Sequence, residues 1–187
     1  MLRTKGLPVI IGVMLVKNES GRYLEKVLTS MYKICHKIIV VDDCSNDNTR
    51  EICKEFGAEV HVSEKSLWGI DELQQRMRLW NLAINNANNK DWILCLDADE
   101  VLEDSKRFVT EIVVPVDWFG QDLDGISFRL FDMWDEKHYR DDEFWNAHNR
   151  QWVFMVRYKE GYKYEWSNKK LHCGRFPLNA CSNVVVS

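Results

Sequence analysis

Carboxylates gather at two points of this 187-residue chain where an apolar segment ends. Asp42 and Asp43 directly follow one such segment, and Asp97, Asp99 and Glu100 follow another. Carboxylates held together suit a hard divalent cation such as Mg²⁺ or Mn²⁺, which keeps several waters and takes further oxygen ligands from substrate phosphates. The competing interpretation of each cluster is a solvated turn whose acidic residue caps the next helix.

The first hundred residues alternate between apolar runs rich in β-branched residues and segments with apolar residues at helical spacing. This alternation predicts βαβ units and a mainly parallel, doubly wound sheet. Ligands of such sheets bind beyond the carboxyl ends of the strands, where both acidic turns fall. We expect strands at 9–16, 37–41, 59–62 and 92–96, and helices at 19–34, 49–56 and 71–86.

The second half changes character, since most of the eight Trp, eight Phe and six Tyr lie there. We expect a helix at 104–113 that Pro115 ends, a strand at 125–131, and a hairpin of 152–158 with 162–166. No linker or repeat is visible. The fold class expected is therefore α/β in one domain, 1–187, with a ligand-binding half at 1–105 and a smaller, aromatic-rich capping half at 106–187.

Composition excludes several classes of protein. With 25 basic and 29 acidic residues the formal net charge is −4, so no nucleic-acid partner is expected. No apolar run reaches the roughly 20 residues of a transmembrane segment. The six cysteines contain no Cys-x-x-Cys pair, which favours reduced thiols in a cytoplasmic protein. A peripheral position at the membrane is left open.

Three motifs together resemble the successive signatures of family 2 glycosyltransferases. They are Met-Leu-Val-Lys-Asn-Glu at 14–19, Ile-Val-Val-Asp-Asp-Cys-Ser-Asn-Asp-Asn-Thr at 39–49, and the segment 91–100 with its Asp-x-Asp. The resemblance covers 8–105 well and the remainder loosely. It implies a GT-A fold and a metal-dependent transfer of sugar from a nucleoside-diphosphate donor, with inversion in most members.

The resemblance also implies roles for individual residues. Asp42 would accept a hydrogen bond from the base, and Asp97 would lie near the ribose and the metal. Asp99 would coordinate the metal, Mn²⁺ or Mg²⁺. The residues implied to border the nucleoside are Leu15, Val16, Asn18 and Glu19.

The chain departs from the family pattern before the Asp-x-Asp strand. Many relatives carry Arg-Asn where this chain has Trp80-Asn81. Arg76 lies one helical turn earlier on the same face, and we expect it to reach the nucleotide or its phosphates. The alternative is a solvated helix residue.

We expect the residues for catalysis and acceptor recognition in the capping half, 106–187. Inverting transfer needs a carboxylate base, and Asp142 is favoured over Asp141 and Glu143, against the alternative of a solvated acidic loop. His172 is a candidate metal ligand, against a structural or exposed role. The candidate aromatic platforms for sugar rings, which core packing would also explain, are Trp134, Trp145, Trp152 and Trp166.

Two other functions remain open. One is a nucleotide-sugar binder without activity, or a truncated transferase, because relatives commonly continue beyond the point where this chain stops. The other is a phosphohydrolase in which Asp97 is the nucleophile, although the Asp-x-Asp of such enzymes normally follows the first strand. The acceptor, whether saccharide, lipid-linked or protein, is not indicated.

Overall fold

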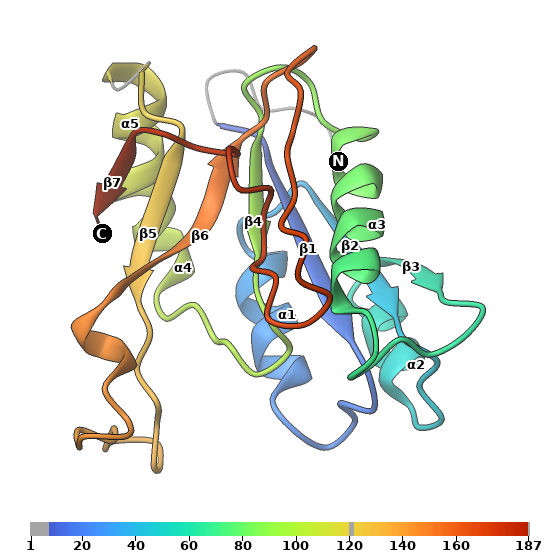
Figure 1. Cartoon of the computed structure of the whole chain (residues 1–187). Helices are drawn as coiled ribbons and strands as arrows, with labels where there is room; N and C mark the ends of the chain where they lie inside the picture. Colours follow the sequence, from blue (N-terminus) through green and yellow to red (C-terminus); the bar gives the residue numbers. More distant parts are fainter. Residues whose placement is uncertain (1–7, 120–121, 187) are drawn as a thin grey trace.

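Seven strands form one sheet in the order β3-β2-β1-β4-β6-β5-β7 (Figure 1). The computed structural model describes residues 8–119 and 122–186. The strands are β1 (Ile10–Val16), β2 (Lys37–Asp42), β3 (Glu59–Val62), β4 (Trp92–Cys95), β5 (Gly125–Arg129), β6 (Gln151–Arg157) and β7 (Val184–Val186). The helices are α1 (Leu24–Tyr32), α2 (Thr49–Glu55), α3 (Glu72–Ile84), α4 (Ser105–Phe108) and α5 (Val114–Phe119).

The directions of the strands bring the functional turns to one edge. β1 pairs in parallel with β2 and β4, and β2 pairs in parallel with β3. β6 is antiparallel to both β4 and β5, so β5 runs in the direction of β4. The segment 130–150, which we call the arm, therefore leaves the sheet at the carboxyl edge of β1 to β4 and projects beyond it (Figure 1).

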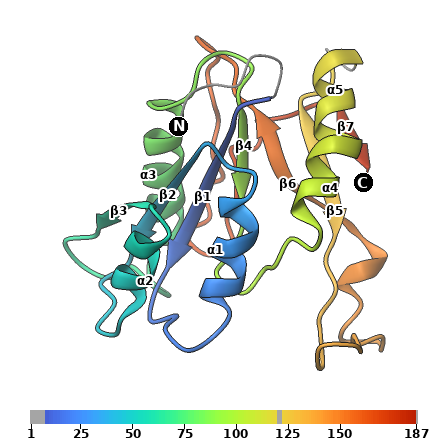
Figure 2. The same ribbon diagram turned by 180° about the vertical axis from the view of Figure 1, so that it is seen from behind.

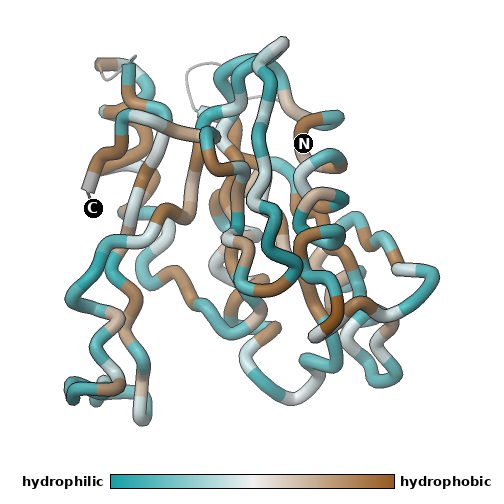
Figure 3. The backbone as a smooth tube through the Cα atoms, in the orientation of Figure 1, coloured by the Kyte–Doolittle hydropathy of each residue, from teal (hydrophilic) through white to brown (hydrophobic). Residues whose placement is uncertain are grey.

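Helices cover both faces of the sheet because both faces of β1 and β2 are apolar. Successive residues of β1 point to opposite faces of the sheet and enter different apolar clusters: Met14 packs with α1, whereas Val13 packs with α3. Figures 1 and 2 show α3 on one face and α1 on the other. The apolar residues run along the central strands (Figure 3). The predicted doubly wound, mainly parallel α/β sheet is confirmed.

Pro115 does not end the helical segment that precedes it. The chain stays helical from Ser105 to Phe119, through α4, a π-helical turn at Val109–Val113, and α5. A proline ring normally meets the carbonyl group four residues earlier, here that of Glu111. Glu111 lies in the wider π-helical turn, which accommodates the ring, so the expected break at Pro115 is wrong.

The predicted hairpin is also wrong in its second strand. The turn at Glu160-Gly161 is present, but residues 162–166 form no strand. β6 already has β4 and β5 as neighbours, so a strand at 162–166 would have no free edge to pair with. Residues 159–181, which we call the strap, run instead without regular secondary structure alongside α3 (Figure 1).

Aromatic contacts hold the strap on α3. Trp80 of α3 is 4% exposed, and its ring lies edge-on to three strap rings. The centroid distances are 4.9 Å to Tyr164, 6.5 Å to Trp166 and 6.1 Å to Phe176. Trp166 therefore packs in the protein, and the expected aromatic-rich capping region takes the form of this strap.

The described helices do not include one that is long and apolar enough to cross a membrane. All six cysteines are free thiols, as expected.

Removing the Trp80 ring tests this arrangement. We expect Trp80→Ala to lower the free energy of unfolding by about 3–5 kcal/mol, because a large buried ring is lost and the strap loses its anchor. Trp118→Ala, at an indole that is 56% exposed on α5, should change it by less than about 1 kcal/mol. Urea titration followed by far-UV circular dichroism measures the free energy of unfolding of both variants. Equal decreases in the two variants would contradict the contact between Trp80 and the strap.

Candidate active site

A cavity of about 230 Å³ opens at the carboxyl edge, between the ends of β1 and β2 and the start of α3. Leu15, Asp43 and Trp68 line it from the sheet side and the loop after β3. Glu72 of α3 and His172 of the strap line it from the other side. Segments far apart in the sequence thus meet around one hollow.

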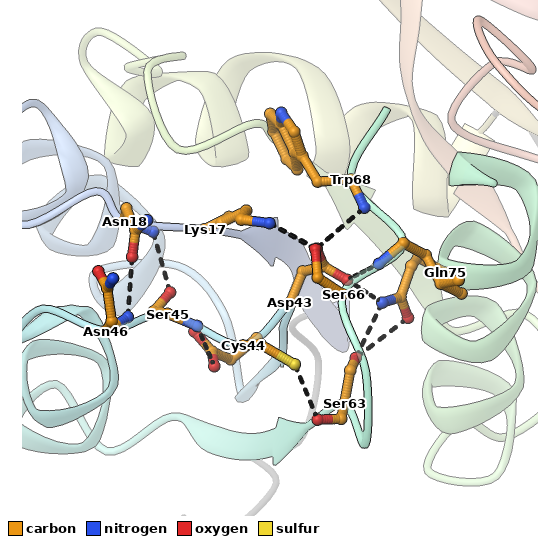
Figure 4. A network of polar contacts seen from close by, with 12 residues as sticks. Lys17, Asn18, Asp43, Cys44, Ser45, Asn46, Ser63, Ser66, Trp68 and Gln75 are labelled. Carbon is orange, nitrogen blue, oxygen red and sulfur yellow. Dashed lines mark hydrogen bonds and ion pairs between the residues drawn. The ribbon is translucent and has the colours of Figure 1, made fainter. Parts of the chain in front are cut away.

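Asp43 is the polar centre of this cavity (Figure 4). Its carboxylate is fully buried and orders the loop between β3 and α3. Burial raises the pKa of Asp43, but the hydrogen bonds it accepts outweigh burial and hold the pKa below its ordinary value. The donors are Leu67 N at 2.8 Å, Trp68 N at 3.0 Å, Ser66 Oγ at 2.6 Å, Lys17 Nζ at 3.4 Å, and Gln75 Nε2.

Asp42 lies on the other face of the sheet, because successive strand residues point to opposite sides. It is completely buried, and Oδ1 accepts a hydrogen bond of 3.0 Å from Ser45 N. Arg50 Nε of α2 is 3.8 Å from the same oxygen. Asp42 is not among the residues that line the cavity. Its predicted contact with a base stays a prediction, and the carboxylate that the structure places at the cavity is Asp43.

The turn after β1 is tied to the turn after β2 (Figure 4). Asn18 N donates to Ser45 Oγ at 2.9 Å, and Asn18 Oδ1 accepts from Asn46 N at 2.9 Å. Asn18 has a φ of 54°, a left-handed conformation that asparagine tolerates. Among the residues implied to border a nucleoside, Leu15 lines the cavity, whereas Val16 is buried in the cluster on the α1 side.

Glu19 shows that the first and fourth strand ends converge. Burial raises the pKa of Glu19, and Arg22, whose Nη1 is 3.1 Å from Oε2, opposes that rise. The negative charges of Asp99 and Asp97 raise the pKa further. The turns after β1 and β4 thus lie close enough for the charges of Asp97 and Asp99 to act on Glu19.

Asp97 is held between two arginines. Arg76 Nη2 of α3 is 2.9 Å from Oδ1, and Arg175 Nη1 of the strap is 3.2 Å from Oδ2. Burial raises the pKa of Asp97, but the two guanidinium groups outweigh it and hold the pKa below its ordinary value. Arg76 is therefore not a solvated helix residue: its side chain is 8% exposed.

Glu100 closes the same turn. Its Oε2 accepts from Asp97 N at 2.8 Å and from Arg175 Nη1 at 2.7 Å, and a second bond joins Arg175 Nη2 to Oε1. On the other side, Arg76 Nε donates to Glu72 Oε1 at 3.1 Å. The Asp-x-Asp turn is thus fixed from both α3 and the strap.

Asp99 and His172 are the two candidate metal ligands. Asp99 is exposed, and within the described ranges its carboxylate has no hydrogen-bond or ion-pair partner. His172 has a φ of 52°, and its backbone N–H donates to Glu72 Oε2 at 3.2 Å. Over residues 8–119 and 122–186, no group of three His, Cys, Asp or Glu side chains forms a metal centre. One unpaired carboxylate fits a Mg²⁺ or Mn²⁺ ion that takes its remaining ligands from water and phosphate.

Asp142 lies on the arm and is exposed. Its Oδ1 accepts hydrogen bonds from Phe144 N at 2.9 Å and Trp145 N at 3.0 Å, so it shapes a turn. The neighbouring Asp141 Oδ1 is 3.3 Å from Nε2 of His148. The arm's position at the carboxyl edge leaves Asp142 as a candidate base, a role that the geometry does not test.

The sequence patterns indicated Asp43 only as part of an acidic turn, and they did not indicate Gln75 or Glu72 as site residues. Gln75 and Glu72 could have been suspected, since both lie in the first turn of α3 near the predicted ligand edge. Which face of β2 carries the cavity depends on long-range packing, so Asp43 could not be distinguished from Asp42.

Comparison with known proteins identifies the family. Residues 13–180 match the family Glycosyl transferase family 2, and the chain belongs to that family. An uncharacterized glycosyltransferase of Rickettsia felis is 35% identical over 103 residues, 55% of this chain and 32% of the relative. One of Mycoplasma pneumoniae is 31% identical over 103 residues, 50% of this chain and 32% of the relative. The match thus spans about a third of these curated relatives.

Among solved structures, glucosyl-3-phosphoglycerate synthase from Mycobacterium tuberculosis with UDP gives a TM-score of 0.45 at 22% identity. The match covers 65% of this chain and 44% of that chain. The same synthase with Mn²⁺, UDP and phosphoglyceric acid also gives 0.45 at 22% identity, covering 65% and 43%. The expected fold class, an α/β sheet of the GT-A kind, agrees with the strand order and with the family.

Asp43→Asn tests the carboxylate at the cavity. The substitution replaces a charged carboxylate, with two acceptor oxygens, by a neutral amide with one. We therefore expect the free energy of unfolding to fall by roughly 2–3 kcal/mol at pH 7. The folded pKa of Asp43 is below the unfolded value of about 3.9, so its stabilisation is complete above about pH 5 and is lost as the pH falls through the folded pKa.

The difference between wild type and Asp43→Asn should therefore narrow below about pH 4. Guanidinium titrations between pH 3 and pH 7 measure it, with Glu103→Gln as a control at an exposed carboxylate. A difference that grows on acidification would contradict the assignment.

Proposed function

We propose that this chain binds a nucleoside-diphosphate sugar together with Mn²⁺ or Mg²⁺ and transfers the sugar to an acceptor with inversion. The observation that carries the proposal is a cavity at the carboxyl edge that Glu72 lines, joined through Arg76 to Asp97 of the Asp-x-Asp turn. Membership of glycosyl transferase family 2 supports it. So does the topology, because ligands of doubly wound sheets bind at this edge.

The cavity around Asp43 is the proposed base site. Leu15 and Trp68 offer apolar contact for a flat ring, and Gln75 and Asp43 offer polar atoms beside it. In this proposal Asp43, whose oxygens are already engaged, holds Leu67 and Trp68 in place, and the base lies against the loop that they form. Asn18 and Glu19 fix the turn at which the nucleoside would end.

The proposed metal ligand is Asp99, with His172 as a second donor. The two arginines already neutralise Asp97, so Asp99 is the carboxylate of the Asp-x-Asp that is free to bind a cation. A divalent cation bound there stabilises the negative charge that develops on a leaving diphosphate. Arg76 acts in this proposal through Asp97, which it orients, and not by direct contact with phosphate.

The proposed base is Asp142, which would take the proton of the acceptor hydroxyl. Its Oδ2 is not used in the turn that Oδ1 holds. A phosphohydrolase is disfavoured, because both oxygens of Asp97, its required nucleophile, face arginines. The free thiols support a reducing compartment such as the cytoplasm.

A thermal-shift experiment tests donor binding. With UDP, GDP or TDP at about 100 times its Kd and Mn²⁺ present, we expect stabilisation of about 2.7 kcal/mol, or roughly 5–10 °C, for the nucleotide that fits. Asp99→Asn should abolish the part of the shift that needs the metal, whereas Glu103→Gln, at a nearby exposed carboxylate, should leave it. A shift independent of metal in the wild type would contradict the role of Asp99.

Asp142→Asn tests the base. Asparagine keeps the side-chain oxygen that shapes the turn but cannot accept the proton, so kcat for transfer should fall roughly 10²–10⁴-fold. The affinity for the nucleoside diphosphate should stay within about twofold, as measured by calorimetry. Full activity in Asp142→Asn would remove it as the base and favour a nucleotide-sugar binder or another carboxylate of the arm.

A further inference from the structure

A second cavity, of about 400 Å³, lies on the other side of the Asp-x-Asp turn. Glu72 lines both cavities, and Asp97 lines the second. The remaining walls come from the start of β6 and from the end of the strap. Its volume falls in the range of small-molecule sites, roughly 300–1,000 Å³. A ligand here would lie next to one bound in the first cavity.

Most of the wall is apolar and includes one fixed aromatic ring. Trp152 is 42% exposed, and its Nε1 donates to Ala147 O at 3.3 Å, so the indole is held by its polar edge. Leu178, 69% exposed, and Pro177 add apolar surface. The C–H face of a pyranose ring packs on an indole face of this kind, because its C–H groups are apolar and meet the negative face of the aromatic ring.

The charged groups in the cavity neutralise one another. Arg76 pairs with Asp97 and Glu72, and Arg175 pairs with Asp97 and Glu100. Two guanidinium groups thus meet three carboxylates, and neither arginine is left without an acidic partner. An anionic ligand would have to displace one of these carboxylates from its arginine. Hydroxyl groups suit the site, because they can donate to the carboxylate oxygens.

We propose that this second cavity is the acceptor site and that it takes an uncharged pyranose ring, with Trp152 as the stacking platform. The inference rests on the proposed transferase function and narrows its acceptor to a neutral sugar. Phosphorylated acceptors are excluded by the absence of a spare cation among the side chains that line the cavity. A purely apolar chain is excluded by the ion pairs at one end.

Saturation-transfer NMR on the full chain tests the proposal. The probes are the methyl pyranosides of glucose, galactose, mannose and N-acetylglucosamine, and the 6-phosphate of each, with and without UDP and Mn²⁺. We expect at least one methyl pyranoside to bind, with saturation strongest at its ring C–H protons. Its 6-phosphate should bind at least tenfold more weakly.

Two variants connect the binding to this cavity. Trp152→Ala should weaken the pyranoside at least tenfold, whereas Trp118→Ala, at an exposed indole on α5, should leave its affinity within twofold. Leu178→Lys keeps the wall but supplies a spare cation at an exposed position. It should raise the affinity for the 6-phosphate at least tenfold relative to the methyl pyranoside.

The outcomes separate the acceptor site from the donor site. Tighter binding of a 6-phosphate by the wild type, or wild-type affinity in Trp152→Ala, overturns the proposal. A protein that binds UDP but none of the pyranosides also overturns it. If the pyranoside binds in the Trp152-dependent way and no nucleoside diphosphate binds, the donor proposal fails and the cavity stands as a sugar-binding site.

Discussion

The position of Asp97 between Arg76 and Arg175 is the constraint on which the site depends. One arginine comes from α3 and the other from the strap, so a single carboxylate joins the sheet, a helix and the C-terminal segment. These pairs are half-buried, and removing one arginine would leave part of the charge of Asp97 uncompensated. The turn after β4 is therefore held in place from both α3 and the strap.

The pairing of Asp97 with Arg76 and Arg175 decides which groups remain available for ligands. Asp97 and Glu100 are paired with arginines of the protein, whereas Asp99 between them is exposed. Asp43 is similarly engaged, with donors from the loop after β3 and from Gln75. Rigid internal bonding around one free carboxylate is a favourable arrangement for a cation shared with a ligand, because the protein supplies position and the ligand supplies oxygens.

The alternation of apolar runs with helical spacing was enough to predict the strands and helices of the first half, including the edge where the first cavity lies. Local patterns were insufficient for residues 162–166, where an aromatic alternation typical of a strand packs on Trp80 instead. The neighbours of β6 decided that outcome, and strand neighbours are set by long-range pairing.

The same limit applies to the candidate site. The acidic turns could be recognised in the sequence. Which of Asp42 and Asp43 lines the cavity depends on the packing of α2 and α3 on opposite faces of the sheet. Arg175 could be assigned from the sequence only to a phosphate contact or to the surface. Its partners Asp97 and Glu100 lie more than 70 residues earlier, a separation that local spacing cannot bridge.

The strap also determines the order in which the molecule can assemble. The central parallel strands and their helices are complete by Cys95, whereas Arg175 reaches the turn after β4 only when a long loop closes. Loop closure over such a separation carries an entropic cost that is recovered only once the distant contacts form. The turn after β4 therefore has both of its arginine partners only when the C-terminal segment is docked.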